Sequence, residues 1–382
     1  MFKNFDLPKE LTEFSDSIED VNILVGENGS GKSIMLNEVA RYHTNAGRNV
    51  IAIANSIYDK FNVRKSNFKI LRGGYGKQLA KRSIIDLLKV FADDYGDNKY
   101  SVLRTLDYIG FDQVLGLKIN PRKINQLKNH RDSNDQESIN SFFAYFYDIM
   151  DSNKVHSKND FVPINLDRNN LQGQLSWDLF RLLRHSKLNQ QEVLRIFDFA
   201  LMKNNQLIEL FGASSGELTL LTSLIFISAN IDKETIILID EPENSLHPKW
   251  QIEFIRLILD LFHLYQPKII IATHSPLIIN GGKLNVQNIN ILKGGPNGFF
   301  PLERNKKNVE EIYEEYFNVT TPENRYLSDF LMSKFNLLTE RKMELSDFEN
   351  VVNRFIDQSY DEVQQKALRG IIKLAHQVES NN

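Results

Sequence analysis

Cysteine is absent from the 382 residues of this sequence, which excludes disulfide bonds and thiolate metal sites and fits a reducing compartment. Long apolar runs are also missing. The longest, residues 218–231, is interrupted by Thr, Ser and Asn and is shorter than the roughly 20 residues of a membrane helix. The opening stretch MFKNFDLPKELTEF lacks the apolar segment of a signal peptide. We therefore expect a cytoplasmic protein that does not enter a membrane.

The sequence has little excess charge of either sign. Its 46 Lys and Arg residues nearly balance 49 Asp and Glu residues, for a net charge of -3, which excludes a wholly polybasic nucleic-acid binder. Basic residues do gather locally, in residues 118–131 and in an acid-free segment that holds Lys60, Arg64, Lys65, Lys69, Arg72, Lys77, Lys81 and Arg82. These segments favour either contact with a phosphate backbone or a solvated surface. Nucleic acid is therefore a candidate partner.

Short apolar runs alternate with helix-like segments along the chain. VNILV and NVIAIA flank NEVARYHTNAG, and TIILI and KIIIA flank a second helical stretch. This order is typical of a parallel sheet covered by helices. We therefore predict an α/β fold with a head in two sequence halves (1–57 and 206–300), a mostly helical insertion (58–205) and a helical C-terminal extension (301–382).

The stretch GENGSGKS follows the first apolar run and precedes a helical segment. G-x-x-x-x-G-K-S in that context predicts a P-loop. The backbone amides of such a loop close around phosphates, its lysine reaches the β and γ oxygens, and its serine hydroxyl faces Mg²⁺. The residues expected to bind ATP are Gly26, Asn28, Gly29, Ser30, Gly31, Lys32 and Ser33.

Two further runs end in polar side chains. Asp240 and Glu241 follow TIILI, and His274 follows KIIIA by one residue. Ligands gather at the carboxyl ends of parallel strands. We expect Ser33 and Asp240 to hold Mg²⁺ and Glu241 to polarise the attacking water as a general base. His274 is expected to contact the γ-phosphate, with a purely structural histidine as the alternative.

The stretch ASSGELTLL admits two interpretations. Ser214 with Glu217 three residues later is a capping box, which begins a helix. The free amides and the dipole of a helix start also suit an anion such as a phosphate. The stretch alone does not separate the two.

Taken in order, GENGSGKS, ASSGE, ILIDEP, ENSLHP and ATHSP resemble the Walker A, signature, Walker B, D-loop and H-loop motifs of ABC-type ATPases. DEPENSLHPKWQ and ATHSPLII are similar to the ATPases grouped with RecF, the overcoming-lysogenization-defect (OLD) proteins and the Septu and retron-associated defence ATPases. The resemblance implies a homodimer that encloses ATP, in which Ser214, Ser215 and Gly216 of one chain face the γ-phosphate bound by the other. Ser215 stands where the family has its first glycine.

The resemblance also implies a function. We expect an ATP-hydrolysing sensor or regulatory subunit of an antiphage defence complex, with a separate effector protein such as a nuclease. No D-x-D motif follows His274, so a nuclease centre in this chain is not expected. One alternative is a RecF-like DNA-repair ATPase, which basic grooves for duplex DNA would favour. The other is a transporter motor, which requires a membrane partner and a D-loop different from ENSLHP.

The C-terminal extension carries apolar stripes at helical spacing. One includes Phe348, Val352 and Phe355, and another includes Leu327, Leu331 and Leu338. Such stripes either cover the main core or dock a partner. Because three stripes are more apolar surface than a terminal appendage needs, we expect the extension to bind the effector.

Overall fold

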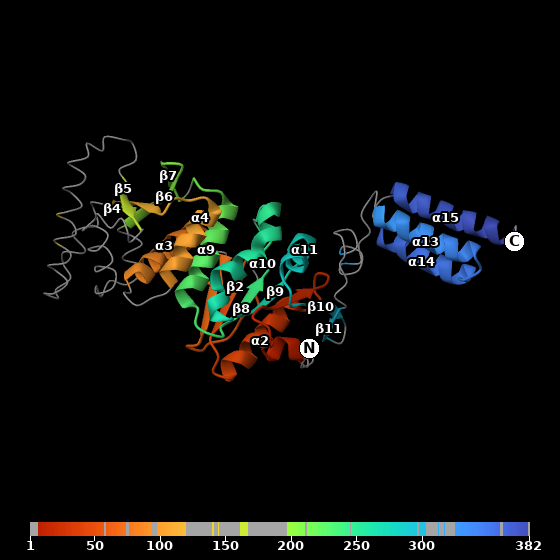
Figure 1. Ribbon diagram of the computed structural model, residues 1–382, viewed down its shortest axis with the longest axis horizontal. Coiled ribbons are helices and arrows are strands. Elements are labelled where there is room, and N and C mark those ends of the chain that lie inside the picture. Colours follow the sequence, from red (N-terminus) through yellow and green to blue (C-terminus); the bar gives the residue numbers. More distant parts are fainter. Residues whose placement is uncertain are drawn as a thin grey trace.

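The computed structural model describes residues 7–56, 59–73, 76–92, 98–119, 161–166, 197–210, 212–244, 246–295, 298–302, 325–359 and 362–380, together with residues 140, 144, 312 and 317. Its centre is a seven-stranded sheet with helices on both faces (Figure 1). The predicted α/β fold class is confirmed. In the described residues, no helix is long and apolar enough to cross a membrane.

The central sheet consists of β1 (Asp20–Val25), β2 (Val50–Ala54), β3 (Phe68–Arg72), β8 (Ile236–Asp240), β9 (Lys268–Ala272), β10 (Ile289–Gly295) and β11 (Gly298–Pro301). Their order is β11-β10-β1-β9-β8-β2-β3. All neighbours are parallel except β10 and β11. β9 therefore lies between β1 and β8, so the ends of these three strands are adjacent.

Alternate residues of each central strand enter two different cores, as the two-residue period of a strand requires. Leu24, Leu238 and Ile270 pack against α1 (Lys9–Thr12) and α2 (Lys32–Asn45). Ile23, Ile237 and Ile271 face the opposite core. Helices α9 (Ser215–Asn230), α10 (Pro248–Phe262) and α11 (Pro276–Asn285) contribute to that core, and a short 3₁₀ turn, His263–Tyr265, follows α10. Burial on both faces explains why these strands are almost continuously apolar.

A second, smaller sheet lies beyond the helices (Figure 1). It is antiparallel, in the order β5-β4-β6-β7, and comprises β4 (Val114–Ile119), β5 (Val162–Asn165), β6 (Phe197–Lys203) and β7 (Gln206–Glu209). Helices α3 (Gly76–Ala92) and α4 (Asn98–Ile109) pack against α9. The described part of residues 58–205 thus holds strands that the sequence analysis did not predict. β3 completes the central sheet, and the boundary drawn at residue 206 divides the hairpin of β6 and β7.

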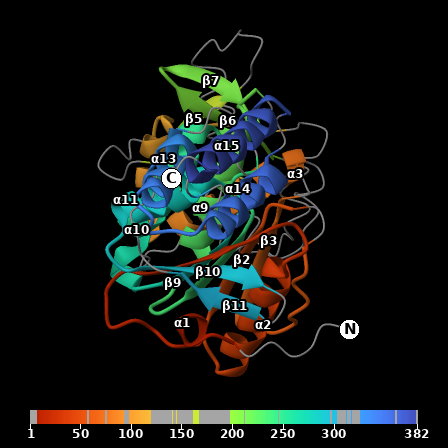
Figure 2. The same ribbon diagram turned by 90° about the vertical axis from the view of Figure 1, so that its right-hand side faces the viewer.

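Three helices close the chain: α13 (Arg325–Thr339), α14 (Leu345–Gln358) and α15 (Glu362–Ser380). They lie apart from the central sheet at one end of the molecule (Figure 1), and Figure 2 views the molecule from that end. The helices bury their apolar stripes against one another, in a core of Leu327, Leu331, Leu338, Phe348, Val352, Phe355, Leu368 and Ala375. The expected surplus of apolar surface is therefore largely internal. The predicted helix start at residues 321–322 lies outside the described residues.

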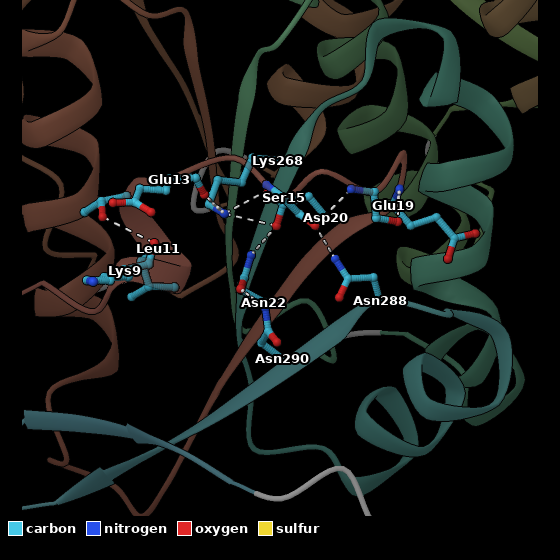
Figure 3. Close-up of polar contacts among 12 residues, drawn as sticks. Lys9, Leu11, Glu13, Ser15, Glu19, Asp20, Asn22, Lys268, Asn288 and Asn290 are labelled. Atoms are coloured by element: carbon cyan, nitrogen blue, oxygen red, sulfur yellow. Dashed lines mark hydrogen bonds and ion pairs between the residues drawn. The ribbon is translucent and has the colours of Figure 1, made fainter.

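A buried ion pair joins the amino ends of β1 and β9 (Figure 3). Lys268 Nζ lies 2.9 Å from Asp20 Oδ2 and also donates to the carbonyl of Glu13 at 2.8 Å. The same carboxylate accepts bonds from the backbone of Ser15 and from the Asn22 amide. Lys268 and Asp20 are only 1% and 3% exposed. The network fixes the segment before β1 at the amino ends of the strands. The loops that follow the strands lie at the opposite end of the sheet.

Candidate nucleotide-binding site

The predicted site residues follow the carboxyl ends of three adjacent strands. In the sheet, Ala272 lies opposite both Leu24 and Asp240. The loops after β1, β8 and β9 therefore leave the sheet at the same level. Two backbone bonds continue across these loops, from Thr273 N to Leu24 O (3.1 Å) and from Glu241 N to Ala272 O (2.9 Å). The fold thus brings the P-loop, Asp240, Glu241 and His274 together at the carboxyl ends of the central strands.

The turn between β1 and α2 contains Gly26, Asn28, Gly29, Ser30 and Gly31, and Lys32 and Ser33 are the first two residues of α2. Two glycines are required by geometry. A Cβ atom on Gly26 would lie 2.9 Å from Ser30 Oγ. Gly31, the N-cap of α2, has φ of 91°, a left-handed conformation that favours glycine. The turn therefore presents the free amides of a helix N-terminus, which suit phosphate.

Lys32 folds back onto the P-loop. Its ammonium group donates to the carbonyls of Gly26 (2.9 Å) and Glu27 (3.2 Å), and the side chain is buried. Burial lowers the pKa of Lys32 to about 8, while the carboxylate of Asp240 acts in the opposite direction. A buried ammonium group held only by carbonyl oxygens can attract an anionic ligand at this loop.

Asp240 is fully buried at the end of β8. Neither of its carboxylate oxygens has a hydrogen-bond partner among the described residues. Burial raises the pKa of Asp240 to about 6, and Ser33 is close enough to lower it without reaching hydrogen-bonding geometry. Buried carboxylates are normally paired or bound to a metal. Two free carboxylate oxygens beside a serine at a helix start fit the oxygen ligands of Mg²⁺.

Glu241 has an uncommon backbone conformation, with φ of 53°. Its carboxylate accepts a bond from the Asn244 side chain (Nδ2 to Oε2, 3.0 Å). A glutamate in the left-handed region costs about 1 to 3 kcal/mol and persists only where the surroundings impose it. The turn after β8 is therefore held in place by other contacts, and it presents Glu241 on the side of the P-loop lysine, whose pKa it influences.

His274 is half-buried beside the same groups. Burial lowers its pKa, the charge of Lys32 lowers it further and Glu241 opposes the change. These surroundings therefore favour the neutral form of the imidazole. Its ring lies 6.1 Å from the ring of Phe317, a buried residue between β11 and α13. His274 at the candidate site therefore lies beside Phe317, a residue between β11 and α13.

Glu243 was missed by the sequence analysis. Its carboxylate accepts bonds from Thr273 Oγ1 (2.8 Å) and from the backbone N–H of His274 (2.6 Å). It joins the loop after β8 to the loop after β9. The only signal in the sequence is a third acid close behind Asp240, and nothing in DEPEN indicates which loop it meets.

The start of α9 contains Ser214, Ser215 and Gly216. Ser214 is the N-cap, and the capping box is complete: Ser214 Oγ accepts from Glu217 N (3.2 Å), and Glu217 Oε2 accepts from Ser214 N (3.0 Å). Ser214 and Ser215 are exposed, whereas Gly216 is buried. Among the described residues, no hydrogen bond joins Ser214 to the P-loop of its own chain. The cap interpretation is therefore realised, and the exposure of Ser214 and Ser215 leaves the anion interpretation open.

Burial would raise the pKa of Glu217, but hydrogen bonds from Lys203 and Ser214 lower it overall. Lys203 Nζ lies 2.7 Å from Glu217 Oε1. The capping carboxylate is therefore ionised at neutral pH and connects the helix start to β6.

Comparisons with known proteins identify the family of the chain. Residues 82–280, more than half of the chain, match the family described as "AAA domain, putative AbiEii toxin, Type IV TA system". This span includes α9 and the carboxyl ends of β8 and β9, and it begins after the P-loop. A curated relative, "Retron Vc95 probable ATPase" from Vibrio cholerae serotype O1 biovar El Tor, is 22% identical in a match that covers 70% of this chain and 68% of that protein.

Among solved structures, VirB4 of Thermoanaerobacter pseudethanolicus matches with 12% identity and a TM-score of 0.29, over 76% of this chain and 81% of that chain. That score is too low to support an argument. The family match and the P-loop context confirm the resemblance that the motifs indicated. This chain belongs to the AAA-domain family of that description and is a P-loop ATPase.

Proposed function

We propose that this protein is an ATP-dependent sensor or regulatory subunit of an antiphage defence complex, which dimerises around ATP and controls a separate effector. The observation that carries the ATP site is the meeting of a buried P-loop lysine, an unpartnered buried Asp240 and Glu241 at one sheet edge. The retron ATPase named above supports the defence role.

The residues divide the work of hydrolysis. Gly26, Asn28, Gly29, Ser30, Gly31 and Lys32 would hold the phosphates of ATP, and Ser33 and Asp240 would hold Mg²⁺. The metal, when bound, neutralises phosphate charge. Glu241 accepts the proton of the attacking water. In its neutral form, His274 would donate its imidazole N–H to an oxygen of the γ-phosphate without adding charge.

The dimer proposal is supported by the exposed start of α9. Its amides, with Ser214, Ser215 and Gly216, suit a γ-phosphate bound by a second chain. Ser214 variants test this. Ser214→Asp keeps a good N-cap but places a negative charge where the phosphate would bind. Ser214→Arg removes the cap, at a cost of about 0.5 to 2 kcal/mol, and adds bulk.

Sedimentation of the Glu241→Gln protein with and without ATP should show an ATP-dependent dimer. Adding Ser214→Asp should abolish the dimer while ATP binding and the unfolding midpoint stay unchanged. A dimer that survives Ser214→Asp would refute the contact. Affinity purification of the unmodified chain from its native host, followed by mass spectrometry, identifies the effector, and recovery of the chain alone would count against a defence complex.

A second function, nucleic-acid binding as in a RecF-like ATPase, is favoured by one surface. Lys60, Arg64, Lys65 and Lys69 are exposed at and before edge strand β3. Two other basic residues of that segment are neutralised: Arg72 pairs with Asp59 at 2.7 Å and Lys81 with Asp198 at 2.6 Å. The second basic segment lies outside the described residues beyond residue 119.

A further inference from the structure

The loops that carry Glu241 and His274 are joined by one partly buried carboxylate, that of Glu243. Glu243 Oε2 accepts the Thr273 hydroxyl at 2.8 Å, and Glu243 Oε1 accepts the backbone N–H of His274 at 2.6 Å. The N–H···O distance of 2.6 Å is short for such a bond, as expected when the acceptor is charged, and the O–H···O distance of 2.8 Å is ordinary. The two bonds therefore hold the backbone of His274 in a fixed position relative to the loop after β8.

The partners of Glu243 are themselves fixed. Thr273 donates its backbone N–H to Leu24 of β1 at 3.1 Å, and its hydroxyl oxygen accepts from Ser275 N at 2.9 Å. Ser275 caps α11, and its hydroxyl donates to Gln251 of α10 at 2.6 Å. Through Thr273, the two hydrogen bonds of Glu243 therefore connect the loop after β8 to β1, the strand that precedes the P-loop. We call this pair of bonds the Glu243 bridge.

The bridge also explains the strained turn. Glu241 keeps φ of 53° although a side chain disfavours this conformation. Within the turn, Asn244 N bonds to the carbonyl of Glu241 and Leu246 N bonds to the carbonyl of Glu243. The carbonyl of Glu243 is held within the turn, and its carboxylate is held by Thr273 and His274. Glu243 therefore supplies the restraint that such strain requires.

We propose that Glu243 is a positioning residue for ATP hydrolysis: it sets the separation between Glu241 and His274 and thereby the rate of the chemical step. The inference rests on the proposed roles of those two residues. Glu243 bonds to the backbone of His274 and leaves the imidazole ring free for the phosphate. A catalytic group displaced by about 1 Å can lose 10²-fold in rate, whereas phosphate binding by the P-loop does not depend on this bridge.

The test compares four variants of the full chain. Glu243→Ala removes both bonds, and Glu243→Gln keeps an acceptor for the His274 N–H. Thr273→Val removes the hydroxyl donor to Glu243, and with it the acceptor for Ser275 N, with little change of volume. Glu253→Ala is the matched control, because Glu253 lies on the partly exposed face of α10 and accepts a bond from Tyr108. Steady-state kinetics give kcat and KM for ATP, and urea unfolding reports stability.

We expect Glu243→Ala to lower kcat by about 10-fold or more with KM changed by less than about 3-fold, the pattern of an interaction that matters in the transition state. Glu243→Gln should recover part of the rate, and Thr273→Val should lie between the two. The control should retain the wild-type kcat. If Glu243→Ala does not fold, the test rests on the kcat values of Thr273→Val and Glu243→Gln compared with that of the wild type.

Wild-type kcat in the Glu243 and Thr273 variants, with only the urea midpoint lowered, would show a merely structural role and overturn the inference. Equal losses in kcat and in ATP affinity would overturn it as well. If the unmodified protein binds ATP and does not hydrolyse it, the proposed function fails first and the positioning role falls with it.

Discussion

Asp240 offers a test of the site's electrostatics without nucleotide. Its carboxyl group is fully buried, and burial raises its pKa to about 6 from the ordinary 3.8. The neighbouring charges of Glu241 and Glu243 act in the same direction. Ser33 and Lys32 oppose the change but do not cancel it. Replacing Asp240 by asparagine removes the titration altogether.

The sign of the effect follows from the direction of the shift. Because the folded chain resists ionisation of Asp240 more than the unfolded chain does, wild-type stability falls as the pH rises from about 4 to about 6 and stays lower above that range. A shift of about two pKa units corresponds to about 3 kcal/mol. Some 2 kcal/mol of this, roughly, develops between about pH 4.5 and about pH 7.5.

The assay is urea unfolding of both proteins at those two pH values, with a chelator and without nucleotide. Asp240→Asn should gain about 2 kcal/mol on wild type between the lower and the higher pH. Any cost of burying the new amide is the same at both values, so it cancels. Added Mg²⁺ should stabilise wild type at the higher pH and leave the variant unchanged. Parallel pH profiles of the two proteins would refute the reasoning.

Three further predictions concern hydrolysis, folding and charge. Glu241→Gln should slow hydrolysis by about 10²-fold or more and retain ATP binding, measured by single-turnover kinetics and equilibrium binding; unchanged turnover would disprove the role. Lys268→Met should lower the free energy of unfolding by about 3 to 5 kcal/mol, because it leaves the Asp20 carboxylate buried without its cation; urea unfolding should show partial recovery on adding Asp20→Asn. Reversing Lys65 and Lys69 to Glu should weaken nucleic-acid binding and flatten its salt dependence; if the unmodified protein shows no salt-sensitive binding, the surface has another role.

The sequence predicted the central strands well because they are buried on both faces. β1, β2, β8 and β9 are short apolar runs, each close to the predicted range. β3 was not predicted, because an edge strand exposes Lys69 between apolar residues and the run FKILR has no clear period. A strand can therefore be predicted from the sequence only where its burial produces a continuous or regularly alternating apolar pattern.

The site was predicted by its motifs and not by its contacts. The P-loop motif placed Lys32 after the first strand, the apolar runs placed Asp240 and His274 at strand ends, and the sheet order then made these residues neighbours. Glu243 could not be assigned, because its role depends on the pairing of β8 with β9 across many residues of intervening chain. The C-terminal stripes show the same limit, since a stripe indicates that a face is covered and not what covers it.

The edges of the central sheet bear on how two copies can meet. β11 is four residues long, antiparallel to β10, and ends in Pro301. β3 is five residues long and exposes Lys69. Short edge strands, proline and lysine discourage the addition of another strand. Fusion of two sheets into one continuous layer is therefore disfavoured, and in the proposed dimer each chain would keep its own separate sheet.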